Sequence, residues 1–355
     1  MKIGIYTDAH FSVHSSILTG SSNSLEGRLK HLIDSFKWMY KIFNDNKVDF
    51  IIDIGDLADK AVLSSAEITA ISTAIKFNDT TPEYHILGNH DRQSEDGSIN
   101  AIEFVELMKN HHLITSITKL NDQITLIPYG YYKDGDLDTI EPTKYAFTHM
   151  DIIGSDIGTG WSIKEGLSPS YLMKLFDWVI NGHIHNHSIV YEYKDKKIIN
   201  FGSISGQNFS SKGTPHIGIL DTEKNSIKYI DNPHALYFET AKCSSVSEII
   251  SFVENLSKDV THAVRLSVPQ KLAEDARKII NNHSDKIIAS KIQFQIDKSN
   301  LNEETIKQAS ELEQINSVES GFAKLRDFID QTDKLPFDKS SILTIIRELE
   351  LNKEI

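Results

Sequence analysis

The sequence has little of what marks secreted, membrane-bound or strongly basic proteins. A single cysteine, Cys243, excludes an internal disulfide framework and fits a reducing compartment. No apolar run approaches the ~20 residues that span a bilayer. The first ten residues lead into a predicted core strand and lack the layout of a signal peptide. We therefore expect a cytoplasmic protein with no membrane segment.

Positive charge is also scarce. Lysine and arginine number 37 against 50 aspartates and glutamates, for a formal net charge of −13 over 355 residues. A protein that binds nucleic acid through its own basic surface needs clustered Lys and Arg. The negative net charge therefore argues against a nucleic-acid-binding protein that works without a partner. The negative charge does not argue against an enzyme that binds phosphates through metal ions, or against one whose partner protein provides the nucleic-acid binding.

What the sequence does have is five polar clusters, each directly after an apolar run typical of a buried strand. In chain order they contain Asp8 and His10; Asp56; Asn89, His90 and Asp91; His149; and His183 and His185. Open α/β sheets gather their sites at strand ends. One such cluster is compatible with a purely structural role, but five in this order indicate a shared site.

The residue types are those of a two-metal hydrolase, in which two divalent ions ~3.5–4 Å apart clamp the attacking and leaving oxygens. One carboxylate must bridge the ions, and imidazoles and an amide oxygen complete the shells. Mixed nitrogen and oxygen ligands suit Mn, Fe or Zn better than Ca. A lone carboxylate buried after a strand is costly, which favours metal ligation for Asp56.

These residues resemble the signature of the calcineurin-like metallophosphoesterases over roughly residues 1 to 205. The motifs that carry the resemblance are Asp8-x-His10, Gly55-Asp56, Gly88-Asn89-His90-Asp91, His149 and Gly182-His183-x-His185. It implies the calcineurin-like phosphoesterase fold, an α/β (α+β) architecture in which a two-sheet β-sandwich is flanked by helices. It also implies two metal-dependent half-sites and hydrolase activity.

The resemblance assigns a role to each position. One ion is expected at Asp8, His10, Asp56 and His185, and the other at Asp56, Asn89, His149 and His183. The remaining two are expected to be catalytic: His90 protonates the leaving oxygen, and Asp91 holds its ring. The chain departs from the family in two places. Thr148 precedes His149 where glycine is usual, and Asp59 stands where some relatives have histidine.

The secondary-structure pattern divides the chain into three domains. Residues 1–235 form the phosphoesterase domain, with helices predicted over 28–46, 64–76 and 101–110. Residues 236–299 alternate strand, helix, strand, helix, strand and have no metal-type clusters, which predicts a small α/β capping domain.

Residues 300–355 are charged and read as a helical tail. Two stretches, 318–330 and 340–351, each place apolar residues on one face. A face of that size favours partner binding, with Phe322, Phe328 and Ile346 as anchors. Packing of the tail onto the core is the alternative.

This domain order is similar to the SbcD/Mre-type DNA repair exonuclease family, which includes recombination nuclease subunits of bacteria and phages. The resemblance implies a DNA exonuclease, with or without endonuclease activity, that acts in DNA recombination, repair or replication. Two Mn ions are expected, with Mg or Fe as alternatives. The expected partners are DNA and an SbcC-type coiled-coil ABC ATPase, with a homodimer of this chain inside a heterotetramer. A phage-encoded protein would work in the host cytoplasm.

Two other functions compete with this one. The first is a stand-alone metallophosphoesterase acting on nucleotides or phosphoproteins, which has no need of a capping domain or tail. The second is a scaffold with a decayed site, which is disfavoured because every ligand position is filled.

Overall fold

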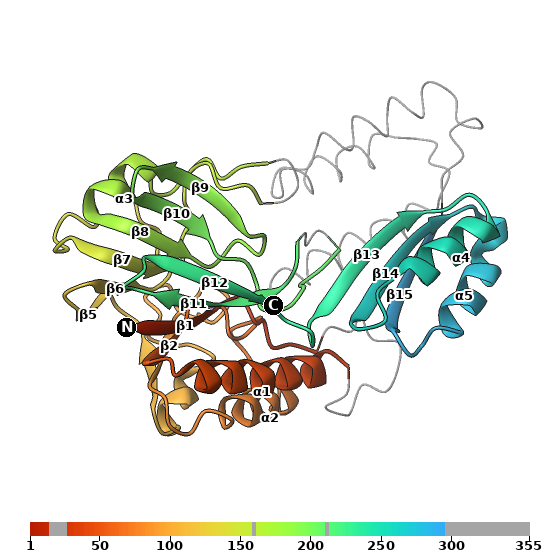
Figure 1. Cartoon of the computed structure of the whole chain (residues 1–355), viewed down its shortest axis with the longest axis horizontal. Coiled ribbons are helices and arrows are strands. Elements are labelled where there is room, and N and C mark those ends of the chain that lie inside the picture. Colours follow the sequence, from red (N-terminus) through yellow and green to blue (C-terminus); the bar gives the residue numbers. More distant parts are fainter. Residues whose placement is uncertain (14–26, 158–160, 210–212, 295–355) are drawn as a thin grey trace, which may run out of the picture. The chain divides into compact units, whose positions relative to one another are not determined.

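Two six-stranded sheets make up most of the molecule (Figure 1). The computed structural model describes residues 1–13, 27–157, 161–209 and 213–294. The first sheet has the order β12 (Ser226–Asp231), β11 (His216–Asp221), β1 (Lys2–Tyr6), β2 (Phe50–Asp53), β3 (Glu83–Ile86) and β4 (His111–Ile114). The second has the order β5 (Thr118–Asn121), β6 (Ile124–Ile127), β7 (Thr143–Thr148), β8 (Phe176–Asn181), β10 (Lys196–Asn200) and β9 (Ser188–Tyr193).

The inner strands of both sheets run parallel. β1, β2, β3 and β4 pair in parallel, as do β6, β7, β8 and β10. The pairs β1–β11, β11–β12, β5–β6 and β9–β10 are antiparallel. Parallel strands are buried on both faces, which explains their nearly continuous apolar sequences. Their carboxyl ends meet at the same edge of each sheet, and all five polar clusters follow such strands: β1, β2 and β3 in the first sheet, and β7 and β8 in the second.

The sheets pack face to face over an apolar core. Ile5 and Ile52 of the first sheet share this core with Phe147 and Ile180 of the second. α1 (Arg28–Asn46) and α2 (Ser65–Ile75) cover the other face of the first sheet, and α3 (Pro169–Leu175) packs on the second. The result is a sandwich flanked by helices, which confirms the predicted fold class.

Local signals explain where the helices begin. α1 coincides with the predicted 28–46 because its apolar residues recur at helical spacing and are buried along one face. α2 begins at a capping box: the Ser64 side chain accepts a hydrogen bond from Glu67 N, and Ser64 N donates to Glu67 Oε2. α3 was not predicted, although Ser168 caps it and Pro169 occupies its first turn.

The predicted helix over 101–110 is wrong. The segment holds only a 3₁₀ helix, Glu103–Leu107, and the chain then enters β4. The apolar spacing misleads here because Leu107 is 86% exposed and only Val105 of the short helix is buried. Pairing of β4 with β3 decides the conformation instead.

A third sheet follows the sandwich. β13 (Leu236–Lys242), β14 (Thr261–Val268) and β15 (Ile287–Phe294) are parallel and are connected by α4 (Val246–Asn255) and α5 (Ala273–Asn281). Ile249, Val253, Leu266 and Ile280 belong to its own apolar core. Residues 1–294 form one compact unit.

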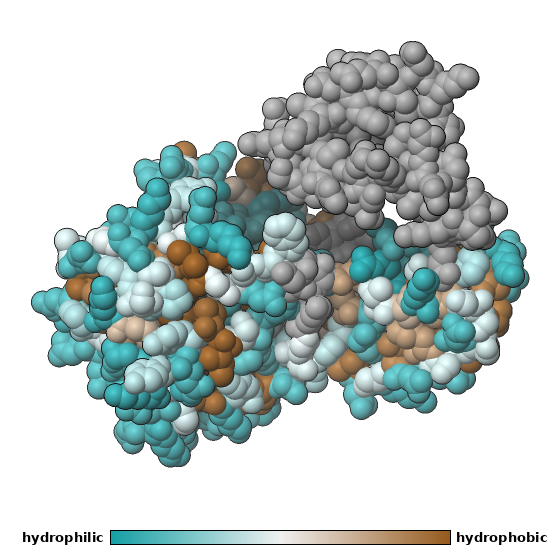
Figure 2. Space-filling model, turned by 90° about the horizontal axis from the view of Figure 1, so that it is seen from above, coloured by the Kyte–Doolittle hydropathy of each residue, from teal (hydrophilic) through white to brown (hydrophobic). Residues whose placement is uncertain are grey.

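The expected partner anchors Phe322, Phe328 and Ile346 lie outside the described residues and remain predictions. In Figure 2, hydrophilic side chains cover most of the described surface, with apolar side chains in short patches between them. None of the helices in the described ranges has the length and apolar character needed to cross a bilayer.

Candidate metal centre

Sharp backbone turns mark the strand ends that carry the polar clusters. Asp8, His10, Asp56 and His183 have positive φ angles of 52°, 48°, 54° and 66°. They account for half of the eight non-glycine residues with positive φ in the described part of the chain. Residues with Cβ rarely adopt this region, and those that do gather at functional sites. The strain is consistent with a backbone shaped to aim these side chains into one site.

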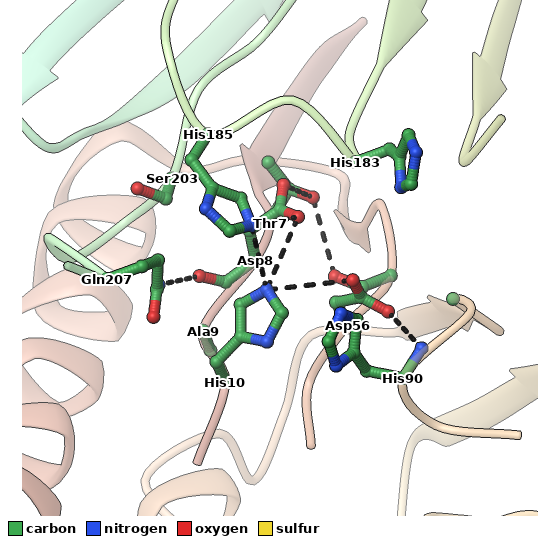
Figure 3. Close-up of polar contacts among 12 residues, drawn as sticks. Thr7, Asp8, Ala9, His10, Asp56, His90, His183, His185, Ser203 and Gln207 are labelled. Carbon is green, nitrogen blue, oxygen red and sulfur yellow. Dashed lines mark hydrogen bonds and ion pairs between the residues drawn. The ribbon is translucent and has the colours of Figure 1, made fainter. Parts of the chain in front are cut away.

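The first half-site joins Asp8, His10, Asp56 and His185. Nε2 of His10 lies 3.1 Å from Nε2 of His185 and 3.7 Å from Oδ1 of Asp8. The same nitrogen is 3.6 Å from Oδ2 of Asp56. Figure 3 shows the His10 ring directed toward all three. Asp8, His10 and His185 lie close enough to share one ion, and Asp56 adjoins them through its contact with His10.

The second half-site joins Asp56, Asn89, His149 and His183. Nε2 of His149 lies 3.2 Å from Oδ2 of Asp56 and 3.0 Å from Oδ1 of Asn89. Nδ1 of His183 lies 2.9 Å from the same Asn89 oxygen. Asp56 Oδ2 thus approaches His10 on one side and His149 on the other, the position expected of a bridging carboxylate.

One orphaned atom shows that the residues fit a cation. The Thr7 hydroxyl donates to Oδ2 of Asp8 at 2.7 Å. Oδ1 of Asp8 is buried and accepts no hydrogen bond from any described residue. It lies 3.6 Å from Nε2 of His185, among the atoms of the first half-site. A buried carboxylate oxygen without a donor is costly, and a metal ion satisfies it.

The charges of the site also favour cations. Burial by itself lowers the pKa of His10, but the carboxylates of Asp59, Asp8 and Asp56 raise it to about 10. At His149, burial also lowers the pKa, but the Asp56 carboxylate raises it to about 9. Without metal, protonated imidazoles therefore balance the buried carboxylates. Two divalent ions would take over that role and leave the imidazoles neutral.

Two carboxylates outside the predicted set orient the ligands. Asp59 Oδ1 lies 3.1 Å from Nδ1 of His10, and Asp151 Oδ1 lies 3.1 Å from Nε2 of His183. Such contacts fix the tautomer and raise the basicity of a metal-binding imidazole. Sequence reasoning missed both roles. The available signal was spacing, since Asp151 follows His149 by two residues and Asp59 follows Asp56 by three.

His149 keeps its place although Thr148 replaces the glycine usual in the family. The Thr148 hydroxyl donates to Oδ1 of Asn181 at 2.8 Å, so the extra side chain is accommodated within the sheet. Nδ1 of His149 contacts the carbonyl oxygen of Ile54 at 2.8 Å, which directs Nε2 toward the other ligands.

Close packing explains two of the motif glycines. A Cβ at Gly88 would stand 2.1 Å from Oδ1 of Asp56, and one at Gly182 would stand 2.5 Å from Oγ1 of Thr7. Either substitution would displace the groups that hold the ions.

The structure separates the two expected catalytic residues. His90 is exposed, its backbone N–H donates to Oδ1 of Asp56 at 2.9 Å, and its ring lies 4.7 Å from that of His10. The expected support from Asp91 is wrong. Nδ1 of His90 pairs with the backbone oxygen of Asp59 at 2.8 Å instead.

The Asp91 side chain binds backbone amides instead of the His90 ring. Its buried carboxylate accepts hydrogen bonds from the amides of Asp56, Ala58 and Gly88 at 3.0, 2.8 and 2.9 Å. Three donors satisfy the carboxylate more fully than one imidazole could. Asp91 therefore fixes the loop that presents the bridging Asp56.

A buried arginine supports the first strand end. Gln207 Nε2 donates to the carbonyl oxygen of Asp8 at 2.6 Å, a contact drawn in Figure 3. Arg28, at the start of α1, donates to Oε1 of Gln207 and to the carbonyl oxygen of Gly206, the latter at 2.8 Å. Neither Arg28 nor Gln207 was predicted, because nothing local in the sequence links them to residue 8.

Comparison with known families decides the assignment. Residues 1–187, more than half of the chain, match the family model for calcineurin-like phosphoesterases. The chain belongs to the calcineurin-like phosphoesterase family. Together with the filled ligand positions, membership makes the protein a metal-dependent hydrolase of phosphate esters that uses two divalent ions.

Solved structures of phosphoesterases each cover 65% of the chain. The phosphoesterase Yfce from E. coli is 12% identical over 65% of this chain and 100% of its own, with a TM-score of 0.34. A dimetal phosphatase from Danio rerio is 8% identical over 65% and 96%, with a TM-score of 0.39. The purple acid phosphatase PPD1 from yellow lupin (Lupinus luteus) is 13% identical over 65% and 51%, with a TM-score of 0.41. A search of curated proteins gave no match.

Proposed function

We propose that this enzyme is the nuclease subunit of a DNA-processing complex and hydrolyses phosphodiester bonds at DNA ends with Mn²⁺. The observation that carries the proposal is a cleft of about 610 Å³ that begins at the metal ligand His185. It continues past Tyr229 to Tyr237, Phe238 and Glu239 of β13. A phosphate monoester would fill a small part of this cleft, whereas a polymer would extend along it.

Aromatic side chains near the other half-site support a nucleic-acid substrate. The Tyr129 ring lies 5.8 Å from that of His183, and the Tyr131 ring lies 5.6 Å from Tyr129. Tyr131 is 73% exposed. Exposed aromatic rings close to a phosphate-binding site offer stacking surfaces for unpaired bases, with little dependence on base identity.

The chain's own groups complete the chemistry. When bound, the two ions polarise the attacking water and the phosphate oxygens. The departing 3′-oxygen of DNA is a poor leaving group and needs a proton. Nδ1–H of His90 donates to the Asp59 carbonyl, so the protonated His90 ring has its Nε2–H left to give to that oxygen and becomes neutral when it does so. Asp56 fixes the position of His90 through the backbone contact at 2.9 Å.

The proposal includes the partner implied by the domain order. A coiled-coil ABC ATPase of the SbcC type would bind the tail and provide much of the DNA binding. It would form a heterotetramer with a homodimer of this chain. The net charge of −13 supports a division of labour, because an acidic nuclease gains from a partner that attracts DNA. The complex would work in the cytoplasm.

End-labelled DNA tests the substrate. With Mn²⁺, the full-length protein should degrade single-stranded or duplex ends faster than it hydrolyses mononucleotides or phosphopeptides. Asp56→Asn is the inactive control for contaminating nucleases. Faster turnover of phosphomonoesters, with intact DNA, would replace the proposal with the stand-alone phosphoesterase.

Removal of residues 315–355 tests the partner. The truncated chain should hydrolyse a small chromogenic phosphodiester almost normally, yet lose co-purification with the co-expressed ATPase and ATP-stimulated cleavage of duplex DNA. If the tail instead packs on the core, the truncated protein should melt earlier and lose both activities together. A truncated chain that still bound the ATPase would refute docking through the tail.

A further inference from the structure

A second group of metal-type side chains lies inside the first sheet, away from the strand ends. Glu83 and His85 are two residues apart in β3, so their side chains lie on the same face of the strand. His111 is the first residue of the neighbouring β4. Glu83 and His85 are 0% exposed and His111 is 4% exposed. The motifs of the hydrolase do not use any of the three.

The spacing of their donor atoms repeats that of the catalytic half-sites. Nε2 of His85 and Nδ1 of His111 are 2.9 Å apart. Oε2 of Glu83 lies 3.6 Å from the His111 nitrogen, and Oε1 of Glu83 lies 3.9 Å from the His85 nitrogen. In the catalytic half-sites the corresponding separations run from 2.9 to 3.7 Å. Oε2 of Glu83, Nε2 of His85 and Nδ1 of His111 thus give three donor atoms.

The surrounding contacts are those of ligands held in place from outside. Asp53 Oδ2 lies 3.0 Å from the remaining His85 nitrogen, Nδ1, the carboxylate–histidine arrangement common around bound metals. Oε1 of Glu83 accepts hydrogen bonds from the hydroxyls of Tyr6 and Tyr40 at 2.7 and 3.1 Å. Asp59 and Asp151 hold His10 and His183 in the same way at the catalytic half-sites.

The inward nitrogens of the two imidazoles, Nε2 of His85 and Nδ1 of His111, face each other at 2.9 Å. A bond between the two imidazoles places the proton of one ring between them, whereas a cation there uses both lone pairs. Burial lowers the pKa of His85 and of His111, the direction that favours the neutral imidazole. Within the described ranges, neither Asp53 nor Glu83 pairs with a lysine or arginine.

We propose that Glu83, His85 and His111 bind a third divalent ion, of the class that favours two imidazoles and a carboxylate, with Zn²⁺ as the best fit and Co²⁺ as its substitute. The ion ties β3 to β4 beneath α1 and is structural, because the buried cluster offers no route to a substrate. It is independent of the proposed nuclease activity. Since the site is closed, the ion enters as the chain folds.

Metal counting tests this site. Full-length protein is expressed with Zn²⁺, dialysed against metal-free buffer, reloaded with Zn²⁺ at the catalytic centre and analysed by inductively coupled plasma mass spectrometry. We expect three ions per chain in the wild type and two in His111→Gln. The matched control is His112→Gln, which changes the adjacent exposed histidine and should keep three. If the wild type holds only two ions and Asp56→Asn loses both, the proposal is wrong and the cluster is a hydrogen-bonded network without metal.

A measurement on the wild type covers the case in which His111→Gln does not fold. Crystals of full-length protein expressed with Co²⁺ or Zn²⁺ are measured on both sides of the metal absorption edge. An anomalous peak between Glu83, His85 and His111 supports the third site. Peaks at the catalytic half-sites without one at this cluster overturn it, whatever substrate the enzyme cleaves.

Discussion

The catalytic centre and the buried cluster of Glu83, His85 and His111 use the same side-chain types at the same spacing, yet they differ in backbone and access. At the catalytic centre the residues follow strand ends, and four of them have positive φ. The side chains of His183 and His185 remain 20% and 27% exposed. The buried cluster lies within strands of regular pairing and is almost fully enclosed.

The difference teaches that position along a strand decides what a set of ligands can do. A side chain within a strand is held by the ladder on both sides and packs into the core. A side chain one or two residues beyond the ladder can turn toward solvent, at the cost of local strain. Hydrolysis needs the second arrangement, because the phosphate must reach the ions.

Asp56→Asn gives the largest expected effect on activity. Both half-sites lose their shared charge, so hydrolysis of a chromogenic phosphodiester with Mn²⁺ should be abolished. The proposed third ion should remain in the metal count, which separates the two regions. Activity close to wild type in this variant would refute the bridging assignment.

His90→Ala should lower the rate by roughly 10²–10⁴ while metal content stays unchanged, because His90 acts on the leaving group. The loss should shrink for substrates with activated leaving groups, which need no proton. Rates on a chromogenic diester and on DNA, measured with the same preparation, check this. If the variant loses a metal ion, His90 is a ligand instead.

Asp59→Asn should weaken the ion at His10 by roughly 10–100-fold, because the amide supports the imidazole less well than the carboxylate. Isothermal titration with Mn²⁺ measures the loss. Asp151→Asn is the matched control and should weaken the other half-site, through His183. An unchanged affinity in both variants would mean that the outer carboxylates do not tune the centre.

Metal loading should also release protons. His10 and His149, with pKa values of about 10 and 9 in the metal-free protein, are charged near neutral pH and must lose their protons to bind metal. Close to two protons per chain should appear at about pH 7.5, and fewer as pH rises toward 10. Calorimetry in buffers of different protonation enthalpy counts them.

The same shifts predict the stability of the metal-free protein. Raised folded-state pKa values stabilise the fold fully below the unfolded value of 6.5, and this contribution is lost as pH rises through about 9 to 10. The buried His85 and His111 have lowered pKa values, so they contribute nothing of this sign. Denaturant titrations across this pH range, without metal, would reveal the trend. Constant stability would contradict the charged state of His10 and His149.

The sequence by itself determined the sandwich, α1 and the residues of the centre. Asp8, His10, Asp56, Asn89, His149, His183 and His185 could be found because each follows an apolar strand directly, and parallel strands bring their carboxyl ends to one edge. These signals are local and need no knowledge of neighbours.

Only the tertiary structure decided how these residues are supported. Asp91 accepts hydrogen bonds from three backbone amides instead of holding the His90 ring. Asp59 contacts His10 through its carboxylate and His90 through its backbone oxygen. Arg28 supports the first strand end through Gln207. The buried cluster depends on β3 meeting β4. Apart from the Gly88 amide, which lies three positions before Asp91, these contacts join residues 26 to 199 positions apart. The pairing of distant segments leaves no periodic signal in either one.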